Sequence, residues 1–124
     1  MEKLELSTLG HTWILDLDGT VIRHNGYIIG GKDVFLEGAE KFLKSIPDKD
    51  MIVFLTSRTE KYRQMTEAFL NTNQIRYDQI IFGAPYGERI LINDDKPSGL
   101  KMGYAVSKSR DESFSLEFKE DSRL

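Results

Sequence analysis

The sequence contains no cysteine and only three prolines among its 124 residues. The lack of cysteine excludes disulfide bonds, thiolate metal sites and a cysteine nucleophile. No apolar run approaches the roughly 20 residues that a membrane-spanning helix needs, and the opening MEKLELSTLG lacks the apolar core of a secretory signal. The net charge of −3 lacks the basic excess typical of nucleic-acid-binding proteins. We therefore expect a cytoplasmic protein that neither spans a membrane nor binds nucleic acid.

The composition is that of an ordinary globular protein, with 40% hydrophobic and 30% charged residues. A chain of this length lies in the range of single domains and can bury roughly two-thirds of its unfolded surface in one core. We predict one domain over residues 1–124, with no internal repeat. This leaves no residues for a second domain that would act as a lid.

The most informative segment is ILDLDGTV, residues 14–21. The apolar residues 13–15 predict a short strand that is buried on both faces. Residues two apart in an extended chain point the same way, so Asp16 and Asp18 should emerge together at the carboxyl end of this strand, before a turn at Gly19. Two such acids repel each other unless a cation lies between them or one of them is protonated, and Mg²⁺ prefers oxygen ligands. The simpler alternative is two acids that are solvated or cap backbone amides.

Two later apolar runs also end in polar residues. The run MIVFL at residues 51–55 predicts a strand, and so does the run at 89–92. The carboxyl ends of parallel strands meet at one edge of a sheet, where ligands bind. We therefore expect one site that gathers the residues following all three strands. In these two later runs the residues that follow are Thr56, Ser57, Asp94 and Asp95.

Helical spacing appears between the predicted strands. Apolar residues at helical spacing predict a helix over residues 33–46 with Asp33 as its cap. Ser57 and Glu60 match a capping box for a second helix that runs to about Asn71. A further short strand is predicted at residues 80–82. Together these elements predict a three-layer α/β fold with a central parallel sheet, because strand–helix–strand connections are right-handed crossovers.

Three segments are less regular. Asn25-Gly26 between apolar pairs predicts a small β-hairpin flap over residues 21–29, beside the acids. Alternation of apolar residues suggests a further strand over residues 100–106. The alternating tail at 114–118 leaves three possibilities open: an edge strand, a docking segment or a contact with another subunit.

The three motifs, in this order, resemble those of the haloacid dehalogenase superfamily, and they span residues 13–95. Most members of that superfamily are Mg²⁺-dependent phosphohydrolases with a Rossmann-like core. The chain looks like a small member without a cap domain, similar to phosphatases of capsule or lipopolysaccharide biosynthesis. The first motif is highly specific, the Asn-Asp-Asp motif moderately so, and the Thr-Ser motif is weak by itself.

The resemblance implies a role for each polar residue. Asp16 would be the nucleophile that forms an aspartyl-phosphate, and Asp18 would protonate the leaving group and then activate water. Asp16, the Asp18 carbonyl and Asp94 would hold Mg²⁺, and Asp95 would orient that shell. Thr56 and the Ser57 amide would bind phosphate at the start of a helix, although plain helix capping explains this pair equally well.

The cation that small relatives carry in a Gly-Lys-Pro segment is missing, because this chain has Gly83-Ala84-Pro85. Lys96, directly after the acids, is the preferred replacement. Arg89 is the second choice, because it lies five residues before Asp94 and therefore at the far end of the predicted strand. Either could instead be a solvated surface charge.

Without a lid the site should be open, unless a neighbouring subunit of a homo-oligomer covers it. An open site favours a bulky substrate such as a phosphorylated sugar, a nucleotide-linked sugar or a polysaccharide precursor. His24, Tyr27 and Tyr86 are possible contacts to the leaving group, although each is more often simply a surface residue.

Two other functions remain as alternatives. A receiver-type phosphoacceptor domain uses similar residues, but it carries an acidic pair on its first strand and the phosphorylated aspartate later, whereas here the DxDGT motif comes first. A catalytically weak accessory protein of the same fold is the other alternative, and Ala84 in place of the expected lysine keeps it open.

Overall fold

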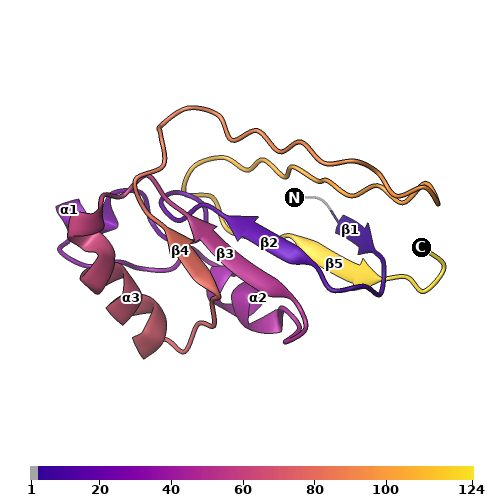
Figure 1. The fold of residues 1–124 in the computed structure, drawn as a ribbon. Helices are drawn as coiled ribbons and strands as arrows, with labels where there is room; N and C mark the ends of the chain where they lie inside the picture. Colours follow the sequence, from indigo (N-terminus) through magenta and orange to yellow (C-terminus); the bar gives the residue numbers. More distant parts are fainter. Residues whose placement is uncertain (1–2) are drawn as a thin grey trace.

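Three parallel strands form the centre of the fold (Figure 1). The structure, a computed structural model, describes residues 3–124. Strand β3 lies between β2 and β4, with Thr12 opposite Met51 and Val53 opposite Gln79. In chain order the elements are β1 (Lys3–Leu6), β2 (Thr12–Leu15), α1 (Gly26–Ile29), α2 (Ala39–Ser45), β3 (Met51–Leu55), the 3-10 helix η1 (Glu60–Tyr62), α3 (Arg63–Thr72), β4 (Gln79–Ile81) and β5 (Glu117–Glu120).

One face of this sheet packs against helices α2 and α3. The chain visits β2, β3 and β4 in order, so right-handed crossovers place both helices on the same face. Ile52 and Phe54 of β3 point into this face, where they share a core with Phe42 of α2 and Leu70 of α3. The α/β class with a parallel sheet is thus confirmed, and β3 coincides with the predicted strand.

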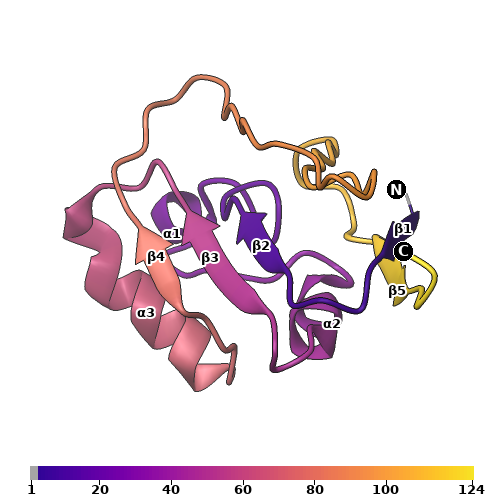
Figure 2. The same cartoon turned by 45° about the vertical axis from the view of Figure 1, so that its right-hand side comes forward.

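The predicted third layer is missing from the part of the chain that the structure describes. Ile14, Met51 and Ile81 lie on the other face of the sheet, and each is about half exposed, so no helix covers them. The chain after β4 forms no helix that could do so. Instead it runs as an extended segment (Figure 2). None of the helices described between residues 3 and 124 is long and apolar enough to cross a membrane.

The predicted β-hairpin at residues 21–29 is wrong. Asn25 has the expected positive φ of 56°, but it precedes the short helix α1, whose amides at Ile28 and Ile29 donate to the Asn25 carbonyl. Ile22 forms isolated bridges with Asp18 and Phe35, neither of which lies within the predicted hairpin at residues 21–29. Burial favours the helix over the hairpin, because Ile22 lies in the core whereas Ile28 and Ile29 are exposed.

The first predicted helix begins later than expected. Helix α2 starts at Ala39, after Gly38, whose φ of 85° breaks a helix that would start at Asp33. Gly38 also lies against the backbone of Phe114, where a Cβ would come within 2.2 Å of the carbonyl oxygen. Asp33 is therefore no helix cap, and its carboxylate binds Arg58 instead.

The capping box predicted for Ser57 and Glu60 is also wrong. Helix α3 starts at Arg63, after the 3-10 turn, and no side chain caps it. The Glu60 carboxylate pairs with the Arg63 guanidinium at 2.7 Å, and the Ser57 hydroxyl donates to the Pro85 carbonyl at 3.3 Å. The partner of Ser57 lies far away in the sequence, so local spacing cannot reveal it.

Residues 83–107, here called the arm, form neither of the strands predicted at 89–92 and 100–106. Two extended stretches of the arm run side by side and join at a turn, in which the Lys96 amide donates to the Leu100 carbonyl (Figure 1). Ile90, Leu91 and Ile92 are 83%, 59% and 91% exposed. The apolar run thus lies along the surface, and the edge of β2 that faces away from β3 pairs with no described strand.

Replacing both Ile90 and Ile92 with serine is expected to change the free energy of unfolding by no more than about 0.5 kcal/mol, because exposed side chains contribute little to stability. Urea denaturation of the variant and the wild type measures the difference. A loss of several kcal/mol, which is typical of truncated core isoleucines, would mean that this run is buried in solution, as the sequence predicts.

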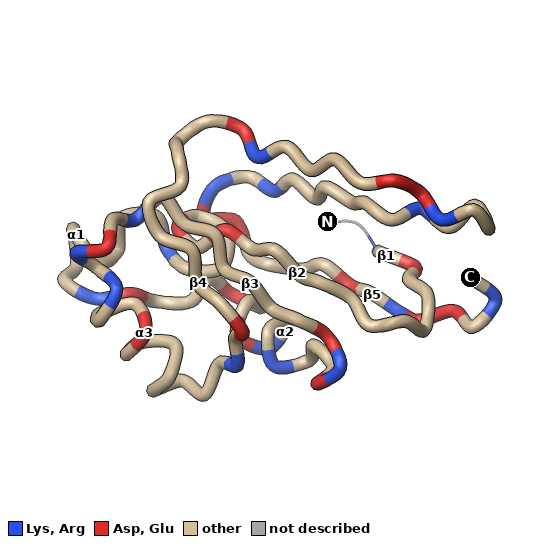
Figure 3. The backbone as a smooth tube through the Cα atoms, viewed as in Figure 1, with Lys and Arg blue, Asp and Glu red and all other residues tan. Residues whose placement is uncertain are grey.

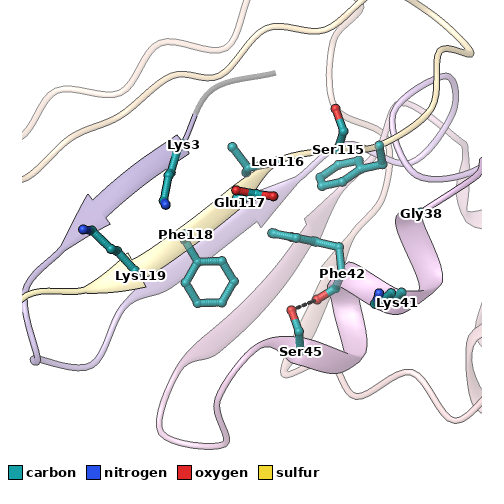
Figure 4. A pocket seen from close by; sticks show the side chains of 11 residues that line it. Lys3, Gly38, Lys41, Phe42, Ser45, Ser115, Leu116, Glu117, Phe118 and Lys119 are labelled. Atoms are coloured by element: carbon teal, nitrogen blue, oxygen red, sulfur yellow. Dashed lines mark hydrogen bonds between the residues drawn. The ribbon is translucent and has the colours of Figure 1, made fainter.

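Strands β1 and β5 form a second, two-stranded parallel sheet in which Lys3 lies opposite Glu117. Of the possibilities for the tail, the edge strand is therefore the one observed. A groove of about 730 Å³ lies between β5 and α2 (Figure 4), and its sides include the rings of Phe42, Phe114 and Phe118. The Phe118 ring also packs 4.9 Å from Trp13, so the tail covers part of the main core.

A buried carboxylate joins the start of β2 to the turn before β3. Asp50 accepts hydrogen bonds from the His11 amide, the His11 ring and the Trp13 indole, all between 2.9 and 3.0 Å. Burial acts to raise the pKa of Asp50, but these hydrogen bonds outweigh it and hold the pKa below its usual value. The Asp50 carboxylate therefore takes up a proton at a lower pH in the folded chain than in the unfolded one.

Asp50→Asn is expected to destabilise the protein by about 1–3 kcal/mol near neutral pH, because an amide cannot accept all of these hydrogen bonds. The stabilisation is complete above the pKa of an unfolded aspartate, about 3.9, and is lost as the pH falls through the lower pKa of the folded protein. Denaturant unfolding between about pH 7 and pH 2 should therefore show the difference shrinking in acid. The control is Asp48→Asn, at a fully exposed side chain; a difference that does not change with pH would contradict the assignment.

Candidate functional site

The carboxyl ends of β2 and β3 lie next to each other at one edge of the sheet (Figure 1). Asp16 and Asp18 follow β2 and flank Leu17, whose side chain is fully buried. The Leu17 carbonyl accepts hydrogen bonds from three amides in the next turn, and Gly19 has the positive φ of 82° that this turn needs. The anchored leucine therefore fixes the backbone between the two acids.

Asp16 is the more accessible acid, with 34% of its side chain exposed. One carboxylate oxygen accepts a hydrogen bond of 3.0 Å from the Thr20 hydroxyl. The other lies 3.5 Å from the Arg89 guanidinium. Asp16 is thus oriented by one neutral donor and faces a cation, and its remaining lone pairs are open to solvent.

Arg89 reaches this edge because the arm leaves β4 on the same side as the two acids. Its guanidinium also lies 3.4 Å from the Ser57 hydroxyl. Lys96, the preferred cation, lies in the turn at the far end of the arm, where its amide and carbonyl hydrogen-bond within the turn. The structure therefore does not bring Lys96 to the two acids, because residues 89–92 do not form the strand that was expected to end beside Asp16.

Asp18 is held by Arg58, which sequence reasoning left without a role. The Arg58 Nε donates to one Asp18 oxygen at 3.0 Å and Nη2 donates to the other at 2.9 Å. Only 17% of the Asp18 side chain and 1% of the Arg58 side chain are exposed. The second acid is therefore fixed by a fork of two charge-assisted hydrogen bonds.

Arg58 has further partners beneath the site. Asp33 accepts from Nη1 and Nη2 at 3.0 and 2.7 Å, and the Thr66 hydroxyl accepts from Nη1 at 2.9 Å. Burial acts to lower the pKa of Arg58, but its bonds to Asp18 and Asp33 outweigh this and raise the pKa. Tyr27, a predicted substrate contact, packs its ring 4.0 Å from the guanidinium instead.

The two residues after β3 differ in accessibility. Thr56 is buried, and its hydroxyl accepts a hydrogen bond from the Arg58 amide at 3.0 Å. Ser57 is partly exposed, between Arg89 and the Pro85 carbonyl. Because α3 does not begin until Arg63, the helix terminus predicted at the phosphate site does not directly follow these residues. Of this pair, Ser57 is the one that a ligand can reach.

The acids of the third motif are not brought to this site. The segment 94–95 lies next to the turn of the arm, far from the carboxyl end of β2 (Figure 3). There the Asp95 carboxylate accepts a hydrogen bond from the Met102 amide at 3.2 Å. Among residues 3–124 no group of three or more His, Cys, Asp or Glu side chains could hold a metal ion. The Mg²⁺ ligand set predicted from Asp16, Asp18 and Asp94 is therefore not assembled.

The remaining predicted substrate contacts are His24 and Tyr86. The His24 amide donates to Asp111, and the buried ring atom Nδ1 has no hydrogen-bond partner within the described chain. Tyr86 is 92% exposed on the arm. Sequence reasoning also missed Lys108, whose ammonium group donates to the Gly19 carbonyl at 3.1 Å. Burial lowers the pKa of Lys108, although the nearby Glu112 opposes this.

No family model matches the chain, and no curated protein matches it. Two chains from solved structures are similar, described as "Structure of the Pnkp1/Rnl/Hen1 RNA repair complex" and "Structure of Pnkp1/Rnl/Hen1 complex". Each is 28% identical with a TM-score of 0.52, over 68% and 67% of this chain. The chain spans only 29% and 31% of those two chains.

Proposed function

We propose that this protein is a phosphohydrolase that acts through an aspartyl-phosphate on Asp16. The observation that carries the proposal is the surroundings of Asp16: an accessible carboxylate at the carboxyl end of a parallel strand, next to an arginine and two residues from a fixed second acid. Phosphoryl transfer depends chiefly on positioning and on charge stabilisation. The resemblance of residues 14–21 to the first haloacid dehalogenase motif supports the same chemistry.

The reaction would proceed in two displacements. An Asp16 oxygen attacks phosphorus, the bond from phosphorus to the leaving oxygen breaks, and the carboxyl of Asp18 gives its proton to that oxygen. Water then attacks phosphorus, Asp18 takes a proton from the water, and the bond to the Asp16 oxygen breaks. The products are an alcohol and inorganic phosphate, and both carboxyl groups return to their initial states.

Arg89 and Ser57 are the groups placed to bind the transferred phosphate. The Arg89 guanidinium lies between Asp16 and the Ser57 hydroxyl, and both arginine and serine side chains are partly exposed there. Guanidinium groups bind phosphate oxygens through two parallel hydrogen bonds. The Mg²⁺ requirement implied by the resemblance stays a prediction, and assays with added Mg²⁺ and with a chelator test it.

Two substrate classes are proposed. A phosphorylated sugar, nucleotide sugar or polysaccharide precursor in the cytoplasm fits an open site, because no described element covers Asp16. A phosphorylated RNA end is the second candidate, favoured by the 28% identity to a chain of an RNA repair complex. That complex contains several proteins, so a partner protein or a second copy of this chain could complete the site.

Inorganic phosphate released by the purified protein tests the proposal. The panel contains an aryl phosphate, sugar phosphates, nucleotide sugars and RNA oligonucleotides with terminal phosphates, each with Mg²⁺ and with chelator. We expect catalytic release from the aryl phosphate and a preference for one substrate class. A stable phosphoprotein formed from acetyl phosphate without turnover would instead indicate a receiver-like domain. No release and no phosphoprotein would leave a non-catalytic accessory protein.

A further inference from the structure

The Arg58 guanidinium has all of its hydrogen-bonding capacity in use. It carries five N–H groups. Two bind Asp18, two bind Asp33 and one binds the Thr66 hydroxyl, all at 2.7–3.0 Å. The Tyr27 ring lies 4.0 Å from its central carbon. Hydrogen bonds in the plane and an aromatic ring on one face together leave the guanidinium a single orientation.

Neutralising the buried arginine does not require Asp18. The Asp33 side chain is only 1% exposed and already supplies one negative charge through two oxygens. Asp18 is a second carboxylate at the other edge of the guanidinium, and its side chain is more exposed than that of Asp33. The buried half of the cluster, formed by Arg58, Asp33 and Thr66, is therefore a support that presents two N–H groups towards the candidate site.

We propose that Arg58 is a positioning residue that fixes the carboxyl group of Asp18 for proton transfer at the site. This rests on the proposed function of Asp18. Each Asp18 oxygen accepts one hydrogen bond from Arg58, so each keeps a lone pair for a leaving group or a water molecule. Arg58 is too deeply buried to touch a substrate, and it therefore acts only through Asp18.

Lysine at this position would keep the charge but not the geometry. Its three N–H groups cannot bind both Asp18 oxygens and also serve Asp33 and Thr66. We expect Arg58→Lys to lower kcat about 100-fold, the effect of a misplaced catalytic group. KM should stay within about threefold of the wild-type value, because substrate binding is untouched.

Two other arginines provide matched comparisons for the same substitution. Arg89→Lys should raise KM, because Arg89 is exposed beside Asp16 and Ser57. Arg63→Lys should change neither parameter, because Arg63 pairs with Glu60 and Glu67 on the surface of α3. A rise in KM with unchanged kcat in Arg58→Lys would overturn the proposal.

Thr66→Val separates a purely structural role of Arg58 from a positioning role. It removes the hydroxyl that accepts from Arg58 and donates to the Tyr62 carbonyl, and it leaves both carboxylates in place. Stability of each variant is followed by circular dichroism, and kinetics are measured where all are folded. If Arg58 only stabilises the fold, both variants lower the melting temperature while kcat stays near the wild-type value in Arg58→Lys, and the proposal fails. If it positions Asp18, Thr66→Val loses less than about threefold in kcat while Arg58→Lys loses far more.

Crystal structures of the wild type and Arg58→Lys give a readout that does not depend on turnover. We expect one orientation of the Asp18 carboxylate in the wild type and a rotated or divided one in the variant. An unchanged Asp18 orientation in the variant would overturn the positioning role even if the enzyme proves active. If the wild type releases no phosphate, the proposed function fails, and the orientation of Asp18 still decides whether Arg58 positions it.

Discussion

Asparagine in place of Asp16 is expected to lower phosphate release by about 10,000-fold or more, the scale seen when a nucleophile is removed from an enzyme. An amide oxygen is too weak a nucleophile to attack phosphorus, so the covalent intermediate cannot form. The fold should persist, because the Thr20 hydroxyl can still donate to an amide oxygen at this position. Steady-state phosphate release and denaturant unfolding measure the two effects.

Asp48→Asn is the matched control for this substitution, because it makes the same chemical change at a fully exposed side chain. It should retain wild-type turnover. Rapid acid quenching after mixing with labelled substrate should trap a phosphorylated wild-type chain and no phosphorylated Asp16→Asn chain. Equal turnover by Asp16→Asn and the wild type would refute Asp16 as the nucleophile.

The largest expected loss of stability comes from Phe54→Ala, at about 3–5 kcal/mol. Phe54 lies in the central strand β3, and its side chain is the largest of those that are fully buried among residues 3–124. The substitution removes a ring from the face that packs against α2 and α3 and leaves a cavity there. A small domain is typically stable by only about 5–15 kcal/mol, so this loss is a large fraction of the total.

Ile14→Ala in β2 provides the comparison, because Ile14 is 56% exposed on the uncovered face of the same sheet. It should cost less than about 1 kcal/mol. Urea denaturation of both variants gives the two values. Similar losses for the two substitutions would contradict the one-sided packing of the sheet.

Local patterns predicted the centre of the fold well. Strand β3 coincides with the run MIVFL, and β2 begins one residue before the predicted strand. On the face that packs against α2 and α3 the apolar pattern and the burial agree, whereas the predicted burial of the other face is wrong, because Ile14 and Met51 are about half exposed there. The positions of Asp16 and Asp18 followed from the strand end and the glycine turn, which are also local features.

The support beneath Asp18 could not be predicted in this way. Arg58 and Asp33 are 25 residues apart in sequence, and their pairing depends on how α1 and the segment after it fold back. The sequence suggested a local role for Asp33, as a helix cap, and no role for Arg58. A buried ion pair leaves no periodic signal, and only the packed structure reveals it.

In the arm, the local pattern predicted a strand that does not form. Ile90, Leu91 and Ile92 have the apolar, β-branched character of a strand, but they lie exposed along the surface. Propensity gives the residues a preference for extended backbone, and the choice of neighbour decides whether an extended segment becomes a strand. This one difference also removed Asp94 and Asp95 from the site and brought Arg89 to it.

Strand β1 can pair only after β5 has been synthesised, so this sheet forms late during synthesis of the chain. Residues 3–6 are made well before their partners, residues 117–120. Until the ribosome has added Phe118, the Trp13 and Phe42 rings lack one of their aromatic neighbours. A nascent chain in which β2, β3 and β4 have already formed would therefore still expose aromatic surface. Exposed apolar surface of this kind makes incompletely folded chains prone to aggregation, and chaperones protect it.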